Sequence, residues 1–75
     1  MNTRRQFPIV IEKDEEGYVA SCPQLKGCYT QGDTYEDVLE NIKDAIKLYC
    51  LELKDSGESI PEAVTVMLTT LDLEM

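Results

Sequence analysis

The chain has no histidine and no long apolar run, and each absence excludes a class of function. Histidine is the side chain that most often moves protons in enzymes, so its absence removes the commonest general acid or base. The apolar run at residues 7–11 is far shorter than a signal-peptide core or a membrane span. We therefore expect a cytoplasmic protein that does not insert into a membrane.

Cysteine is also scarce. The chain has three cysteines, an odd number that does not suit a secreted disulfide framework, and the spacing of Cys22, Cys28 and Cys50 is not a recognised zinc pattern. We expect reduced thiols that act as small apolar residues, with no metal and no cofactor.

The charge balance is strongly acidic, with fifteen acidic residues against seven basic ones and a formal net charge of −8. Such a surface repels phosphate backbones, so direct nucleic-acid binding is not expected. It suits electrostatic steering onto a basic protein, although solubility alone explains the charge as well.

The composition that remains is that of a small folded domain. A chain of 75 residues with 43% apolar residues and three prolines predicts one domain over residues 1–75 rather than a disordered segment. Because so short a chain buries a modest core, self-association or a bound partner is an expected source of further stability.

The first half of the sequence predicts three short strands. Residues 7–12 alternate with the two-residue period of a strand, and the turn at residues 14–17 returns the chain so that Lys13 pairs with Tyr18. A third strand follows at residues 28–31 and ends at Gly32.

A long amphipathic helix is predicted over residues 35–55. Thr34 is the expected N-cap and Gly57 the expected C′ residue. At 100° per residue one arc collects the apolar side chains that should cover the sheet, namely Val38, Leu39, Ile42, Ala45, Ile46, Tyr49, Cys50 and Leu53.

A fourth strand is predicted at residues 63–70, which completes the order β-β-β-α-β of an α+β fold. The right-handed crossover rule places this strand parallel to the first, in a mixed four-stranded sheet of spatial order 3-2-1-4 with the helix on one face. The last strand is then an edge with no proline or charge to protect it. We predict a homo-oligomer, a dimer or a tetramer, whose interface contains the edge residues and two leucines outside the helical arc: Leu48, Leu51, Thr65, Met67 and Thr69.

The segment FPIVIEKDEEGYVASCPQLKGCYTQGDTYEDVLENIKDAI resembles the HicB antitoxins of HicAB toxin-antitoxin systems. The likeness rests on an acidic-Gly turn followed by Tyr-x-Ala-x-x-Pro, then Leu-x-Gly-Cys, then Thr-x-Gly-Asp-Thr and an amphipathic helix. The resemblance implies a degraded ribonuclease-H-like fold that has lost catalysis, and a partner, the small basic HicA toxin that cleaves mRNA. Many HicB proteins continue into a domain that binds operator DNA, and since this sequence stops at Met75 we expect a short form without it.

Catalysis is not expected. A ribonuclease-H-type site needs carboxylates that converge on two Mg²⁺ ions, and the middle of the first predicted strand is Ile9-Val10-Ile11, without an acidic ligand. Glu12, Glu40 and Asp72 are a conceivable displaced set, but acids at such positions are usually solvated surface.

We therefore predict a binding module that neutralises a HicA-like ribonuclease by covering its active-site surface. Four acids are expected to steer the encounter: Glu15, Glu16, Glu36 and Asp37. Four apolar or aromatic side chains are expected to supply buried contact: Tyr18, Leu25, Tyr29 and Tyr35. Two alternatives stay open: the tyrosines only cover the end of the sheet, or the chain is a structural or regulatory oligomer without a toxin.

Overall fold

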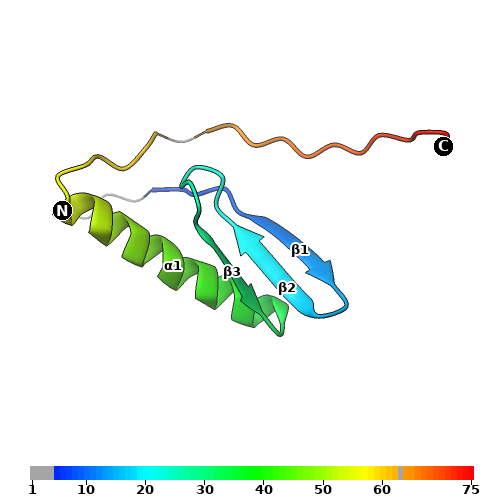
Figure 1. The fold of residues 1–75 in the computed structure, drawn as a ribbon, viewed down its shortest axis with the longest axis horizontal. Helices are drawn as coiled ribbons and strands as arrows, with labels where there is room; N and C mark the ends of the chain where they lie inside the picture. The colour runs from blue at the N-terminus through cyan, green and yellow to red at the C-terminus, as the bar shows by residue number, and fades with distance from the viewer. Residues whose placement is uncertain (1–4, 63) are drawn as a thin grey trace.

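A computed structural model of the chain describes residues 5–62 and 64–75 and has two layers, a small sheet and one long helix (Figure 1). The elements in chain order are β1 (Val10–Asp14), β2 (Gly17–Ser21), β3 (Tyr29–Gly32) and α1 (Tyr35–Asp55). The three strands form an antiparallel meander in the order β1-β2-β3. The predicted α+β class is therefore confirmed.

The first hairpin has the predicted register, since Lys13 pairs with Tyr18 and Ile11 with Ala20. Its turn is closed by Asp14, whose Oδ1 accepts hydrogen bonds from the backbone N–H groups of Glu16 at 2.8 Å and of Gly17 at 3.1 Å. An aspartate that binds its own chain two and three residues later is a common turn device.

The loop between β2 and β3 is held by three backbone hydrogen bonds. Cys22 donates to the Cys28 carbonyl at 3.0 Å, Leu25 donates to the Cys22 carbonyl at 3.0 Å, and Cys28 donates to the Leu25 carbonyl at 3.1 Å. Because Cys28 takes part in closing this loop, β3 begins one residue later than predicted, at Tyr29. The bonds also turn the middle of the loop toward the core.

Both predicted ends of the helix are confirmed. Thr34 Oγ1 accepts a hydrogen bond from the Asp37 N–H at 3.0 Å, as an N-cap does. At the other end Gly57, with φ +76°, donates to the Lys54 carbonyl and Glu58 donates to the Leu53 carbonyl, which is the Schellman arrangement.

Replacement of the N-cap residue Thr34 tests how much the cap contributes to the stability of the fold. Because Thr34→Ala leaves one amide of the first helical turn without its acceptor, we expect the free energy of unfolding to fall by about 1 kcal/mol in urea denaturation. Thr34→Ser keeps the hydroxyl and should lose far less. An equal loss in both variants would show that the methyl group, not the cap, is what matters.

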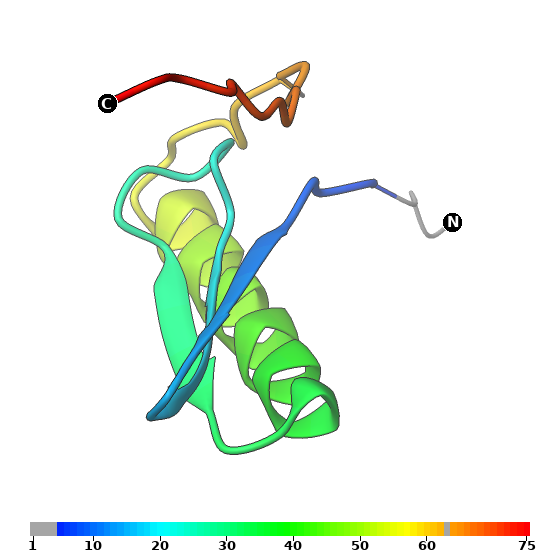
Figure 2. The ribbon, with the colours of Figure 1, turned by 90° about the vertical axis from the view of Figure 1, so that its right-hand side faces the viewer.

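The core lies between the sheet and the helix (Figure 2). Its fully buried side chains come from β2, the loop after it, Cys28 and the helix, and they are Ala20, Cys22, Leu25, Cys28, Val38 and Ile42. Most of the predicted helical arc packs on this core, while Leu39, at 38% exposed, lies at its margin. Leu48 and Leu51, predicted to lie outside the arc, are 63% and 56% exposed.

The predicted fourth strand is not formed by the described residues. Residues 64–75 have an extended path but belong to no strand, so the predicted sheet order 3-2-1-4 is not made within the chain; Ala63, where the strand was predicted to begin, lies outside the described residues. Gln24 Nε2 donates to the Pro61 carbonyl at 2.6 Å and holds the start of this segment against the β2–β3 loop. From there the chain runs out past the sheet (Figure 1). Alternating Val and Thr predict an extended backbone, but they do not specify the strand with which it pairs.

Candidate functional site

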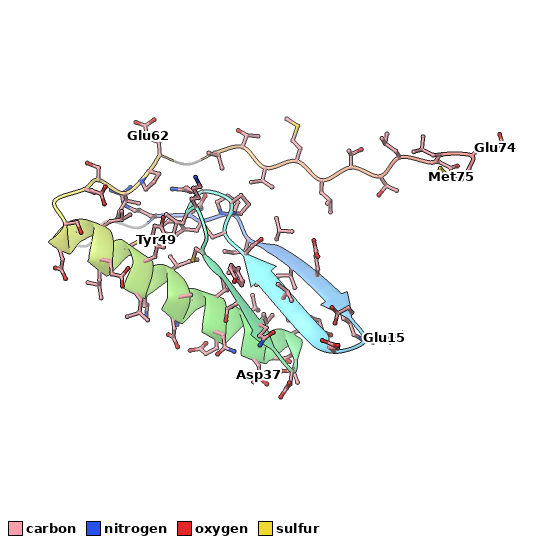
Figure 3. All side chains as sticks on the ribbon, in the orientation of Figure 1. Glu15, Asp37, Tyr49, Glu62, Glu74 and Met75 are labelled. Atoms are coloured by element: carbon pink, nitrogen blue, oxygen red, sulfur yellow. The ribbon has the colours of Figure 1, made fainter. Side chains whose placement is uncertain are left out.

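An acidic cleft of about 610 Å³ lies at the end of the molecule where β2 begins, β3 ends and α1 begins. Five of its lining residues carry carboxylates and none carries a positive charge. The cleft is lined by Asp14, Glu16, Gly17, Tyr18, Val19, Gln31, Gly32, Asp33, Asp37, Glu40 and Asn41. Figure 3 shows Glu15 and Asp37, labelled there, at this end of the molecule. We call this site the acidic cleft.

Two glycines allow the three elements to meet at the cleft. A Cβ added to Gly32 would lie 2.7 Å from the backbone nitrogen of Val38, so β3 and the first turn of α1 approach more closely than a side chain allows. A Cβ added to Gly17 would lie 2.8 Å from the Gly32 carbonyl oxygen, and Gly17 also has φ +138°. Glycine is the residue that permits such close backbone approaches.

Residues of α1 line one side of the cleft. Asn41 Nδ2 donates to the Gln31 carbonyl at 2.8 Å and ties the second turn of α1 to β3. Asp37 and Glu40 lie three residues apart on this helix, so they share one side of it, and Asp33 precedes its N-cap. The positive end of the helix dipole stabilises acids placed here.

Aromatic rings flank the acidic cleft. The rings of Tyr18 and Tyr35 meet edge to face, with centroids 6.3 Å apart and an interplanar angle of 73°. Lys13 Nζ lies 5.6 Å from the centroid of the Tyr18 ring, a cation–π distance. Tyr35 is 48% exposed and therefore keeps free ring surface beside the cleft.

Tyr29 lies in a shallower hollow of about 330 Å³ on the sheet. Val19 and Gln31 line both this hollow and the acidic cleft, so the two form one continuous surface. Tyr29 is 71% exposed, the highest value among the tyrosines flanking the cleft. The surface thus combines negative charge with exposed aromatic rings.

The structure brings together most of the residues that the sequence predicts for partner binding. Glu16, Tyr18 and Asp37 line the cleft, and Tyr35 joins it through its contact with Tyr18. Glu15 and Glu36 are exposed chain neighbours of cleft residues.

Leu25 is the exception, and the prediction that it is presented to a partner is wrong. It is 1% exposed and belongs to the core. The hydrogen bonds that close the β2–β3 loop turn the Leu25 side chain inward. The sequence shows only an apolar residue in a loop and does not indicate which way its side chain points.

The sequence reasoning missed several cleft residues, among them Asp14, Asp33 and Asn41. The sequence suggests Glu40 only as a displaced metal ligand, whereas in the structure it lines the acidic cleft. The spacing of Asp37 and Glu40, three residues within the predicted helix, is the signal that places these two on one side of it.

Within residues 5–62 and 64–75, no three His, Cys, Asp or Glu side chains are grouped as a metal ion would require. The described part of the chain also has no helix whose length and apolarity would let it cross a bilayer.

Cys22 and Cys28 are free thiols in the core, and burial raises the pKa of Cys28 above its ordinary value of 9.0, with a further increase from the nearby Cys22. This thiol is therefore protonated near neutral pH.

Comparison with protein families decides the relationship. The family described as HicB-like antitoxin of bacterial toxin-antitoxin systems matches residues 7–74. The chain belongs to this family. The resemblance seen in the sequence motifs is thereby confirmed.

Relatives of similar size share this family's sequence. A UPF0150 protein of Thermoplasma acidophilum is 46% identical over 66 residues, which cover 81% of this chain and 96% of that protein. A UPF0150 protein of Archaeoglobus fulgidus is 50% identical over 54 residues, 71% of this chain and 77% of that protein.

Among solved structures, a chain of the HicA3 and HicB3 toxin-antitoxin complex matches with a TM-score of 0.63 and 31% sequence identity. The match covers 73% of the present chain and 64% of the other, so somewhat more than a third of that chain has no counterpart in the match.

Proposed function

We propose that this HicB-like protein is a non-catalytic antitoxin that acts in the cytoplasm by binding a small basic HicA-like ribonuclease and covering its active-site surface. The observation that carries the proposal is the acidic cleft flanked by tyrosines, in a chain of an antitoxin family. The similarity to a chain of a toxin-antitoxin complex supports the same kind of partner.

The cleft suits a basic partner because its charge is concentrated and of one sign. Five carboxylates in one concave site focus the electrostatic potential, and lysine or arginine side chains of a partner can replace their water shell. Steering of this kind acts mainly on the association rate. The acids placed in this role are Glu15, Glu16, Glu36 and Asp37 from the sequence, together with Asp33 and Glu40 from the structure.

The tyrosines complete the surface with apolar area. Tyr18, Tyr29 and Tyr35 offer rigid rings that lose little conformational entropy on binding, which is why tyrosine is common at interface anchor points. In the proposal these rings govern how slowly the complex dissociates. Lys13 helps to orient Tyr18 through the contact of its Nζ with the ring.

Charge reversal in the cleft tests this mechanism. We expect Glu16→Lys, Asp37→Lys and Glu40→Lys together to lower the association rate with a purified HicA-like toxin by about tenfold or more at low salt. The effect should shrink as salt is added, since screening weakens steering. Stopped-flow or surface-plasmon measurements over a salt series give the rates.

A matched control places the same change in charge elsewhere. Glu52, Asp55 and Glu58 are exposed and lie at the far end of the helix, outside the cleft. Reversing these three should slow association much less. Equal slowing by both triple variants would mean that net charge alone matters and that the cleft has no special role.

A second candidate function is a regulatory or structural homo-oligomer without a toxin, favoured by the exposed apolar side chains outside the cleft. The five residues predicted for an oligomer interface, Leu48, Leu51, Thr65, Met67 and Thr69, are all exposed. Co-purification with a basic protein encoded by the adjacent reading frame separates the two functions, because only an antitoxin retains such a protein.

A further inference from the structure

The chain exposes more surface than a folded monomer of its size. Its accessible surface is 6768 Å². The scaling for monomeric proteins gives about 4,700 Å² at 8.5 kDa, so the excess is about 2,100 Å². The radius of gyration is 14.6 Å, against about 11 Å for a compact chain of this length. A standard protein interface needs only about 800 Å² from each partner.

Much of this excess comes from residues 64–75, the C-terminal segment, which extends along the 50 Å long axis of the molecule (Figure 1). All of its residues are exposed. Leu68 is 93% exposed, Met67 85% and Leu71 76%, although these are residues that proteins normally bury. Between Val64 and Leu71 the segment has no charged residue and no proline.

A strand edge is available to receive such a segment. β1 pairs with β2 along one side only, so the backbone groups of its other side are unpaired within the described residues. Beside this edge Phe7, Ile9 and Ile11 are only half-buried, and they pack against the core from its rim. An added strand would cover these apolar side chains and pair the open backbone groups.

We propose that two copies of this chain exchange their C-terminal segments, with residues 64–70 of one copy added as a fourth strand, parallel to β1, on the β1 edge of the other. Val64, Val66 and Leu68 lie on one face of the added strand and cover Ile9 and Ile11 of the second copy. The exchange is reciprocal and closes with two-fold symmetry, so it forms a dimer rather than a filament. It completes the β-β-β-α-β order across two chains.

The path at the start of the C-terminal segment favours pairing with β1 of a second copy over pairing with β1 of the same chain. The hydrogen bond from Gln24 to the Pro61 carbonyl fixes the connection against the β2–β3 loop, and beyond it the segment leads away from its own sheet. For an intramolecular fourth strand, the segment would have to turn from this path toward β1. The proposal does not depend on toxin binding, because neither the β1 edge nor the segment lines the acidic cleft except at Asp14.

Sedimentation velocity on the full chain tests the dimer. We expect a dimer at micromolar concentration, and we expect Val66→Asp with Leu68→Asp to raise its dissociation constant about a hundredfold, because each charge would be buried beside β1. Circular dichroism should show that the three-stranded sheet and helix remain. Leu51→Asp is the matched control, since Leu51 is exposed on the helix and lies outside the exchanged strand.

Isotope-filtered NMR identifies which chain donates the strand. Labelled and unlabelled chains are unfolded together and refolded, and contacts between residues 64–70 and 10–14 are then recorded across the two kinds of chain. Intermolecular contacts support the exchange. A monomer, a dimer whose segment contacts only its own β1, or a dimer that Leu51→Asp dissociates and the double variant does not would overturn it.

Discussion

Leu25→Ala is expected to lower the free energy of unfolding by about 2–5 kcal/mol, the range for removing a buried leucine side chain. Leu25 is 1% exposed and is among the largest fully buried side chains of the described chain. Its loop is closed by three backbone hydrogen bonds, so the neighbours cannot collapse readily into the space that the substitution leaves. Urea denaturation or calorimetry measures the loss, which corresponds to a fall in Tm of about 10 °C or more in a domain of this size.

Leu51→Ala is the matched control, because Leu51 is 56% exposed. An exposed leucine in a helix should cost less than about 0.5 kcal/mol on truncation to alanine. The pair also separates two roles for Leu25. If it were a partner contact rather than a core residue, Leu25→Ala would leave the unfolding curve unchanged and weaken only toxin binding.

Gly32→Ala is expected to cost about 3 kcal/mol, the upper part of the usual range for overpacking. The added Cβ would lie 2.7 Å from the nitrogen and 2.9 Å from the Cα of Val38. Both are backbone atoms of a helical turn, so neither can rotate aside as a side chain would. The Val38 N–H also donates the hydrogen bond to the Thr34 carbonyl that starts the helix, and the methyl group pushes against it.

Gly27→Ala is the comparison for this substitution. Gly27 has φ +79°, which disfavours alanine, but a Cβ there meets nothing within 4 Å. It should cost about 1 kcal/mol from backbone conformation alone. We also expect Gly32→Ala, and not Gly27→Ala, to shift the amide NMR signals of the helix start and of the acidic cleft. A smaller loss for Gly32→Ala than for Gly27→Ala would contradict the close approach of β3 and the helix.

The sequence predicted the local elements well because their signals are local. The acidic turn before Gly17, the N-cap Thr34 and the C′ Gly57 each act within a few residues, and the structure confirms them. The first strand is present but is shifted, from the predicted residues 7–12 to Val10–Asp14. The prediction of a fourth strand was wrong for the opposite reason. An extended backbone can be read from alternating residues, whereas the neighbour that pairs with it depends on the whole fold.

The candidate site was predicted in part for the same reason. Glu16, Tyr18 and Asp37 lie next to a turn or a helix start, and these places were visible in the sequence. The cleft itself arises where three elements converge on two glycines, and no local pattern describes that convergence. The position of Leu25 depends on loop hydrogen bonds between residues three to six apart, which the composition of the loop does not reveal.

The meander has a consequence for the order of folding, because each strand pairs with the one before it and the helix follows at once. Contacts between near neighbours in the chain form quickly. All lining residues of the acidic cleft lie between Asp14 and Asn41, so this face rests on contacts of low sequence separation that can form early in folding. The face proposed to meet a toxin would then be in place before the slower pairing of the C-terminal segment with a second copy.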